Sequence, residues 1–168
     1  MNRKEILLGS GSPANPGLVT AWSPEKAAAL ETDLHAIKGL LDKPVLRAPE
    51  VRWAELVLRQ LKLQLPKNSD VYKLTGVLAH RLNNNGLAVG QLRHAYALNP
   101  ADVENATNLA AALRAQGKLS EAQSYLEAAE ARAPRSAVVH HNKGNIFAEQ
   151  GAFRAAAEAY RQSLSLRP

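Results

Sequence analysis

The sequence has no cysteine, so a disulfide framework and thiolate metal sites are excluded. Aromatic residues make up only 5% of the chain, too few for the stacking platforms that bind single-stranded nucleic acids. Apolar runs are also short. The run Ile6-Leu7-Leu8 cannot serve as a secretory signal, and nothing approaches a membrane span. We therefore expect a soluble, cytoplasmic protein without membrane or nucleic-acid partners.

Charge and catalytic motifs add no sharper functional signal. The net charge of +6 is spread along the chain and forms no single basic stripe, which further disfavours nucleic-acid binding. The five histidines show no spacing typical of metal ligands, and no nucleophile–base–orienter set is evident. We predict no catalytic residue, no metal and no cofactor, and hence no enzyme, unless the chain is a fragment of one.

The placement of proline is informative. Pro66, Pro100, Pro134 and Pro168 follow one another at intervals of 34 residues. A fixed period of this length is typical of helix–turn–helix repeats that stack on one another. The fold is therefore predicted to be all-α, a solenoid of antiparallel helix pairs in which each unit packs against its neighbours.

Other residue types recur at the same period. Favoured N-cap residues follow three of the prolines by two positions, at Asn68, Asp102 and Ser136. Small residues in the first helix of each unit recur with large ones in the second, as expected where helices approach closely and the space between them is filled. These pairs are Gly76 with Leu92, Ala110 with Leu126, and Gly144 with Tyr160. The repeat therefore predicts which helix faces meet.

The turns inside the units are predicted from residues that tolerate positive φ. Gly117 and Gly151 stand between the two helices of the second and third units. The first unit has Asn83-Asn84-Asn85-Gly86 at this place, a different loop with the same permissiveness.

Residues 137–168, AVVHHNKGNIFAEQGAFRAAAEAYRQSLSLRP, strongly resemble a tetratricopeptide repeat, and residues 103–134 do so as well. The unit 69–100 is a looser match. The resemblance implies a right-handed superhelical solenoid whose first helices line a concave groove. It also implies a bacterial scaffold protein that binds a peptide or a partner protein in that groove.

The domain organisation follows from the repeat and from what precedes it. Residues 1–22 are expected to be an extended or flexible leader, and residues 23–66 a degenerate helix pair that caps the solenoid. The first helix of this pair starts at Ser23-Pro24-Glu25, and the second runs from Pro49 toward Leu65. Residues 67–168 are expected to form three repeats, 69–102, 103–136 and 137–168.

The register of the family predicts which side chains of the first helices face the groove. The candidate site residues are Lys73, Arg81, Thr107, Asn108, Arg114, His141, Asn142 and Asn145. Asn108 and Asn142 match a column in which asparagines either bind the backbone of an extended peptide or tie helices together, and both roles remain open. The three cationic side chains would give part of the groove a positive potential suited to an acidic partner.

Two further expectations concern the partner. The carboxylate-clamp subset of the family, which grips acidic chaperone tails, is disfavoured because Val77, Val138 and Asn142 replace three of its five residues. The last unit has no polar terminal helix, so its apolar face, with Phe147, Tyr160 and Leu164 as candidates, could support homo-oligomers. Alternatively, the repeats are the N-terminal substrate-recruiting arm of a larger enzyme of the glycosyltransferase, sulfotransferase or hydroxylase type.

Overall fold

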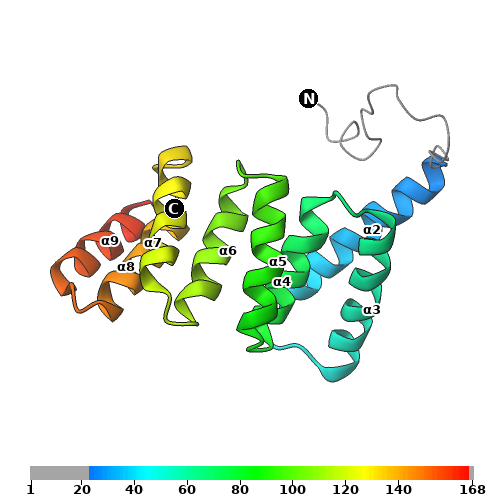
Figure 1. Cartoon of the computed structure of the whole chain (residues 1–168), viewed down its shortest axis with the longest axis horizontal. Coiled ribbons are helices and arrows are strands. Elements are labelled where there is room, and N and C mark those ends of the chain that lie inside the picture. The colour runs from blue at the N-terminus through cyan, green and yellow to red at the C-terminus, as the bar shows by residue number, and fades with distance from the viewer. Residues whose placement is uncertain (1–22, 167–168) are drawn as a thin grey trace. The chain divides into compact units, whose positions relative to one another are not determined.

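The computed structural model describes residues 23–166, and the expected leader 1–22 lies outside this part of the chain. Within residues 23–166 there are eight helices and no strand, so the predicted all-α class is confirmed. The chain divides into two compact units, Met1–Asn68 and Ser69–Pro168, and each is described by itself (Figure 1).

The first unit contains α2 (Pro24–Leu41) and α3 (Ala48–Gln64), close to the bounds expected from sequence. The side chain of Ser23 caps α2, as predicted, by accepting a hydrogen bond from the amide of Lys26 at 3.3 Å. At the start of α3, the Glu50 carboxylate accepts from the amide of Arg47 at 2.8 Å. Both helices therefore begin where a side chain satisfies an amide that has no partner within the helix.

The second unit is built from three helix pairs that follow one another along the chain (Figure 1). The pairs are α4 (Ser69–Arg81) with α5 (Asn85–Leu98), α6 (Val103–Arg114) with α7 (Leu119–Arg132), and α8 (Ala137–Glu149) with α9 (Phe153–Ser165). The two helices of each pair pack together, and α5 and α7 also contact the first helix of the next pair. This is the predicted solenoid of stacked helix pairs.

Small and large residues meet inside the pairs as the period predicted. A Cβ atom added to Gly76 would lie 2.5 Å from Cγ of Leu92, and one added to Gly144 would lie 2.5 Å from Cε1 of Tyr160. Real Cβ atoms do not come this close to neighbours, so glycine at these two positions is what allows the helices to approach. In these two pairs, a large side chain of the second helix therefore fills the space that a glycine leaves on the first helix.

The turns also follow the sequence, with one difference. Gly117 and Gly151 have φ of 73° and 75°, the left-handed conformation that ends a helix at low cost in glycine. In the first pair Asn83 takes this conformation, with φ of 58°, whereas Gly86 lies inside α5. Among the permissive residues of this loop, the chain uses the asparagine two positions after the end of α4.

Candidate functional site

The predicted site residues lie on the first helices of the three pairs. Helix α6 contacts both α4 and α8, so these first helices are neighbours in the solenoid. We call the surface that they share the first-helix face and define it by the eight candidates. These are Lys73, Arg81, Thr107, Asn108, Arg114, His141, Asn142 and Asn145.

Lys73 is a buried cation shared between two helix pairs. Its Nζ atom lies 2.9 Å from Asp102, 3.1 Å from Glu104 and 3.3 Å from Asp70. The Lys73 side chain is only 11% exposed and that of Asp102 16% exposed. Because Asp70 belongs to α4 while Asp102 and Glu104 stand at the start of α6, this cluster ties the first pair to the second.

Two opposing effects act on the pKa of Lys73. Burial lowers the pKa because it penalises the charged form, but the hydrogen bond and charge of Asp102, helped by Asp70 and Glu104, outweigh it. The pKa of Lys73 therefore lies above its ordinary value, and the side chain is an ammonium ion at neutral pH. Three carboxylates face this single cation, so the positive potential predicted from Lys73 is wrong at this end of the face.

The other two cations are also engaged. Arg114 pairs with Glu149 of the next first helix, and its buried Nε atom has no hydrogen-bond partner within residues 23–166. Arg81 is half-buried and takes part in interactions of its own. The Arg114–Glu149 pair links α6 to α8 much as the Lys73 cluster links α4 to α6, so these charges serve the stacking of the repeats.

Two candidates direct their polar groups into their own helices. Thr107 is buried, and its hydroxyl donates to the carbonyl of Val103 at 2.7 Å. Asn142 is half-buried, and its Nδ2 atom donates to the carbonyl of Val138 at 3.0 Å. Each of these side chains therefore has an intrahelical partner, and Asn142 keeps its Oδ1 atom and one amide hydrogen for other contacts.

Asn108 differs from the other candidates. Its side chain is half-buried, and its amide makes no hydrogen bond to any described part of the chain. A side-chain amide can both donate and accept, and one that is half-buried and unused is available to a ligand. Among the asparagines of the first-helix face, Asn108 is the one whose amide has no hydrogen-bond partner within residues 23–166.

On α8, two candidates surround one tyrosine. The hydroxyl of Tyr160 donates to Oδ1 of Asn145 at 2.8 Å, and the rings of His141 and Tyr160 have centroids 5.7 Å apart. Because His141 is exposed and Asn145 half-buried, the three side chains form a small, partly accessible cluster. Asn145 keeps free amide hydrogens, which a bound peptide could use.

Sequence reasoning missed Asn105, which stands one turn before the middle of α6. Its side chain is 1% exposed, and its Nδ2 atom donates to the carbonyl of Leu92 on α5 at 3.2 Å. Valine occupies the equivalent positions of the other units, at Val71 and Val139. An asparagine in a column otherwise occupied by valine could have pointed to Asn105. Its hydrogen bond to Leu92 ties the second helix pair to the first.

Lys143 stands in a column occupied by leucine at Leu109. Its Nζ atom lies 2.6 Å from Glu130 of α7, with the Lys143 side chain 18% exposed. Nearby, the buried His140 bonds through Nε2 to the carbonyl of Pro134 at 2.8 Å. Both residues thus serve packing between the second and third pairs.

The last helix carries exposed apolar side chains. Phe153 and Leu164 of α9 are 73% and 65% exposed, whereas Phe147 and Tyr160 are half-buried. Of the three candidates for an exposed apolar face, Leu164 is exposed whereas Phe147 and Tyr160 are not, and Phe153 was not among the candidates.

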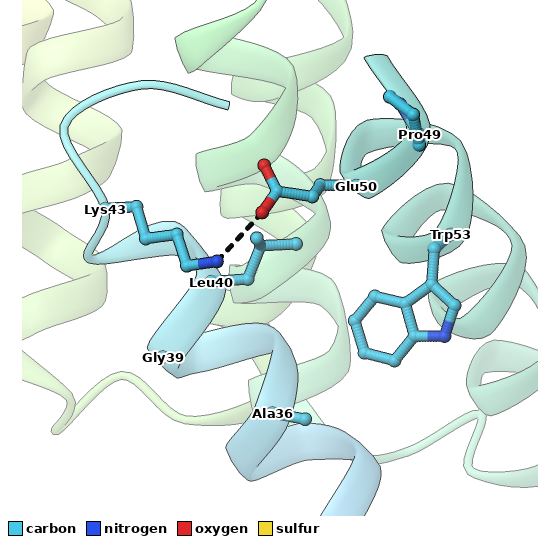
Figure 2. A pocket seen from close by; sticks show the side chains of 7 residues that line it. All are labelled: Ala36, Gly39, Leu40, Lys43, Pro49, Glu50 and Trp53. Carbon is cyan, nitrogen blue, oxygen red and sulfur yellow. Dashed lines mark hydrogen bonds and ion pairs between the residues drawn. The ribbon is translucent and has the colours of Figure 1, made fainter. Parts of the chain in front are cut away.

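A separate slot lies in the first unit, between α2 and α3 (Figure 2). It is a shallow depression with a volume of about 550 Å³, and most of it is open to solvent. Ala36, Gly39 and Leu40 of α2 form one wall, and Pro49 and Trp53 of α3 form the other. At the rim, Nζ of Lys43 lies 2.8 Å from the Glu50 carboxylate. That bond, and the one from the Arg47 amide, hold the pKa of Glu50 below its usual value.

The side chains and helices of residues 23–166 match the requirements of neither a metal site nor a membrane span. These residues contain no group of three or more histidine, aspartate or glutamate side chains placed to hold a metal ion. None of their helices combines the length and apolar character needed to span a bilayer.

Part of the chain is similar in sequence to known proteins. Residues 137–168 match the family model described as tetratricopeptide repeat. The protein FlbA from Caulobacter vibrioides is 36% identical over 104 residues, which are 62% of this chain but only 17% of FlbA. The chain thus spans about a sixth of the length of this relative.

Solved structures agree on the fold. A crystal structure of MamA superposes with a TM-score of 0.68 at 18% identity, covering 82% of this chain and 77% of MamA. YrrB, described as a tetratricopeptide repeat protein with an unusual peptide-binding site, superposes with a TM-score of 0.65 at 23% identity, covering 86% and 74%. The 34-residue period, the stacked helix pairs and the tetratricopeptide repeat matched at residues 137–168 together give the chain the solenoid fold of tetratricopeptide repeat proteins.

Proposed function

We propose that this chain is a protein-interaction module whose first-helix face binds an extended peptide or a segment of a partner protein. The observation that carries the proposal is the unused, half-buried amide of Asn108 at the middle of the face. In solenoids of this kind, stacked repeats provide an extended binding surface. The described peptide-binding site of YrrB, a structural neighbour, supports the same class of function.

The contacts favour some partners over others. Lys73 is surrounded by Asp70, Asp102 and Glu104, and Arg114 is paired with Glu149. An acidic peptide, which the sequence suggested, would meet cations that are already neutralised and a surplus of carboxylates. We therefore expect a neutral or basic segment to bind more tightly, with an affinity that falls as salt is added.

The experiment begins with a peptide selected on the full chain from a random displayed library, and calorimetry measures its affinity. Asn108→Ala is expected to weaken binding about tenfold, because an amide that makes two hydrogen bonds to a ligand contributes about 1–3 kcal/mol. The matched control is Gln162→Ala, which removes an exposed amide from the second helix α9. Equal affinities for the wild type and Asn108→Ala, with unchanged helicity, would remove Asn108 from the site.

A second candidate function has its own supporting observation. The matching region makes up only a small part of FlbA, so repeats similar to these also occur inside a much longer protein. We infer as the alternative that the chain is the recruiting arm of a larger enzyme. Immunoblotting of source cells distinguishes the two, since a free module has a mass of 18.1 kDa and an enzyme arm belongs to a much larger band.

A further inference from the structure

The slot of the first unit is not used by the proposed function. Its shape results from small residues on α2 facing a large one on α3. A Cβ atom added to Gly39 would meet no atom within 4 Å, and Trp53 opposite is 42% exposed. An apolar side chain that entered this space would gain contacts with the indole ring and remove apolar surface from water.

The rim of the slot adds charges of both signs. Lys43 and Glu50 form an ion pair whose side chains are 53% and 28% exposed. Figure 2 shows this pair beside Leu40, at one end of the space that faces Trp53. A segment suited to the slot would therefore combine apolar residues with adjacent charged residues of both signs.

The sequence contains such a segment upstream of α2. In residues 3–8, Arg3, Lys4 and Glu5 directly precede the apolar residues Ile6, Leu7 and Leu8. These residues lie outside the described part of the chain. We propose that the slot between α2 and α3 binds residues 3–8 of the same chain, with apolar side chains against Trp53 and charged ones near the Lys43–Glu50 pair.

The reach of the connecting chain fits this assignment. About fifteen residues join Leu8 to Ser23, and a chain of this length can reach at most about 50 Å. Along α2, the distance from Ser23 to Gly39 is about 24 Å at 1.5 Å per residue. The slot therefore lies within reach of residues 3–8, and a site on the same chain raises the effective concentration of the segment.

Disulfide trapping tests the proposal, because the natural chain has no cysteine. Leu7→Cys is combined with Ala36→Cys, in the slot, or with Lys38→Cys as the matched control. Both α2 positions are exposed and differ by two residues, which places them about 200° apart around the helix. A disulfide forms only when the two Cα atoms come within about 7 Å.

At low protein concentration, we expect the intramolecular disulfide with Ala36→Cys to form about tenfold faster than that with Lys38→Cys. Equal rates would show that the segment only diffuses around α2 and would overturn the proposal. Disulfides between two chains would overturn the assignment to the same chain.

Fluorescence gives a second readout without cysteines. In a Trp22→Phe background, Trp53 is the remaining tryptophan. Leu7→Asp should shift its emission to longer wavelength and raise its quenching by acrylamide, because the indole loses its cover. Identical emission and quenching with Leu7 and Asp, at unchanged helicity, would contradict docking in the slot.

Discussion

The contact between Gly144 and Tyr160 allows the repeat geometry to be tested in depth. A Cβ atom at position 144 would lie 2.5 Å, 2.6 Å and 2.9 Å from three ring atoms of Tyr160. The ring has little freedom to move, because its hydroxyl is bonded to Asn145. Gly144→Ala must therefore displace the ring or separate α8 from α9.

The magnitude follows from two opposing effects. Overpacking a filled contact costs about 1–3 kcal/mol, whereas alanine in place of glycine inside a helix gains about 0.5–1 kcal/mol. We expect Gly144→Ala to lower the free energy of unfolding by about 1 kcal/mol, or the Tm by about 4–8 °C for a unit of this size. Gly90→Ala is the control, since a Cβ atom there meets nothing within 4 Å, and it should raise the stability.

The repeat also predicts a rescue. The second pair has Ala110 and Leu126 at the positions of Gly144 and Tyr160, so Gly144→Ala with Tyr160→Leu recreates a combination that the solenoid already contains. Thermal unfolding followed by circular dichroism should give a double variant more stable than the sum of its single changes, by about 1 kcal/mol. The reasoning is refuted if Gly144→Ala stabilises the protein as much as Gly90→Ala does.

Three other predictions concern charge and association. Lys73→Met should lower the free energy of unfolding by about 2–3 kcal/mol, because it leaves the buried Asp102 unpaired. The control Arg161→Met breaks an exposed ion pair and should change the free energy of unfolding by less than about 0.5 kcal/mol. Urea unfolding measures both variants. The pKa of Lys73 is higher in the folded than in the unfolded chain. Its ion pairs therefore contribute fully to the free energy of unfolding below the unfolded pKa of about 10.4, and this contribution is lost as the pH rises through the folded pKa. The difference between wild type and Lys73→Met should therefore shrink at strongly alkaline pH, and a constant difference there would contradict the assignment. If the exposed side chains of α9 support self-association, light scattering at high concentration should detect oligomers of the wild type. The double variant Phe153→Ser with Leu164→Lys should stay monomeric. A monomeric wild type would contradict self-association through α9.

The sequence predicted those features of the fold that depend on local chemistry or on the period. Asp102 and Ser136 cap α6 and α8 through hydrogen bonds to the amides three residues on, and Gly117 and Gly151 take the positive φ that their turns require. Such features need only a few neighbouring residues, and the 34-residue period then repeats them. The choice of Asn83 over Gly86 was not predictable, because both residues tolerate the left-handed conformation.

The candidate site was less predictable, because its chemistry depends on contacts between repeats. Lys73 looked like a free cation, but stacking brings it to Asp102, 29 residues later in the chain. The repeat register could not identify Asp102 and Glu104 as the partners of Lys73. The slot beside Trp53 was missed for a related reason. It depends on how α2 and α3 diverge, which the pattern of apolar residues in either helix does not specify.

The central claim is that binding takes place on the first helices, around Asn108. It is tested most directly by amide chemical-shift mapping of the isotope-labelled full chain during titration with the selected peptide. The account predicts that the largest shifts cluster in α6 and in the adjoining parts of α4 and α8, and that Asn108→Ala reduces them. Shifts concentrated on the second helices α5, α7 and α9, or unchanged by that substitution, would contradict it.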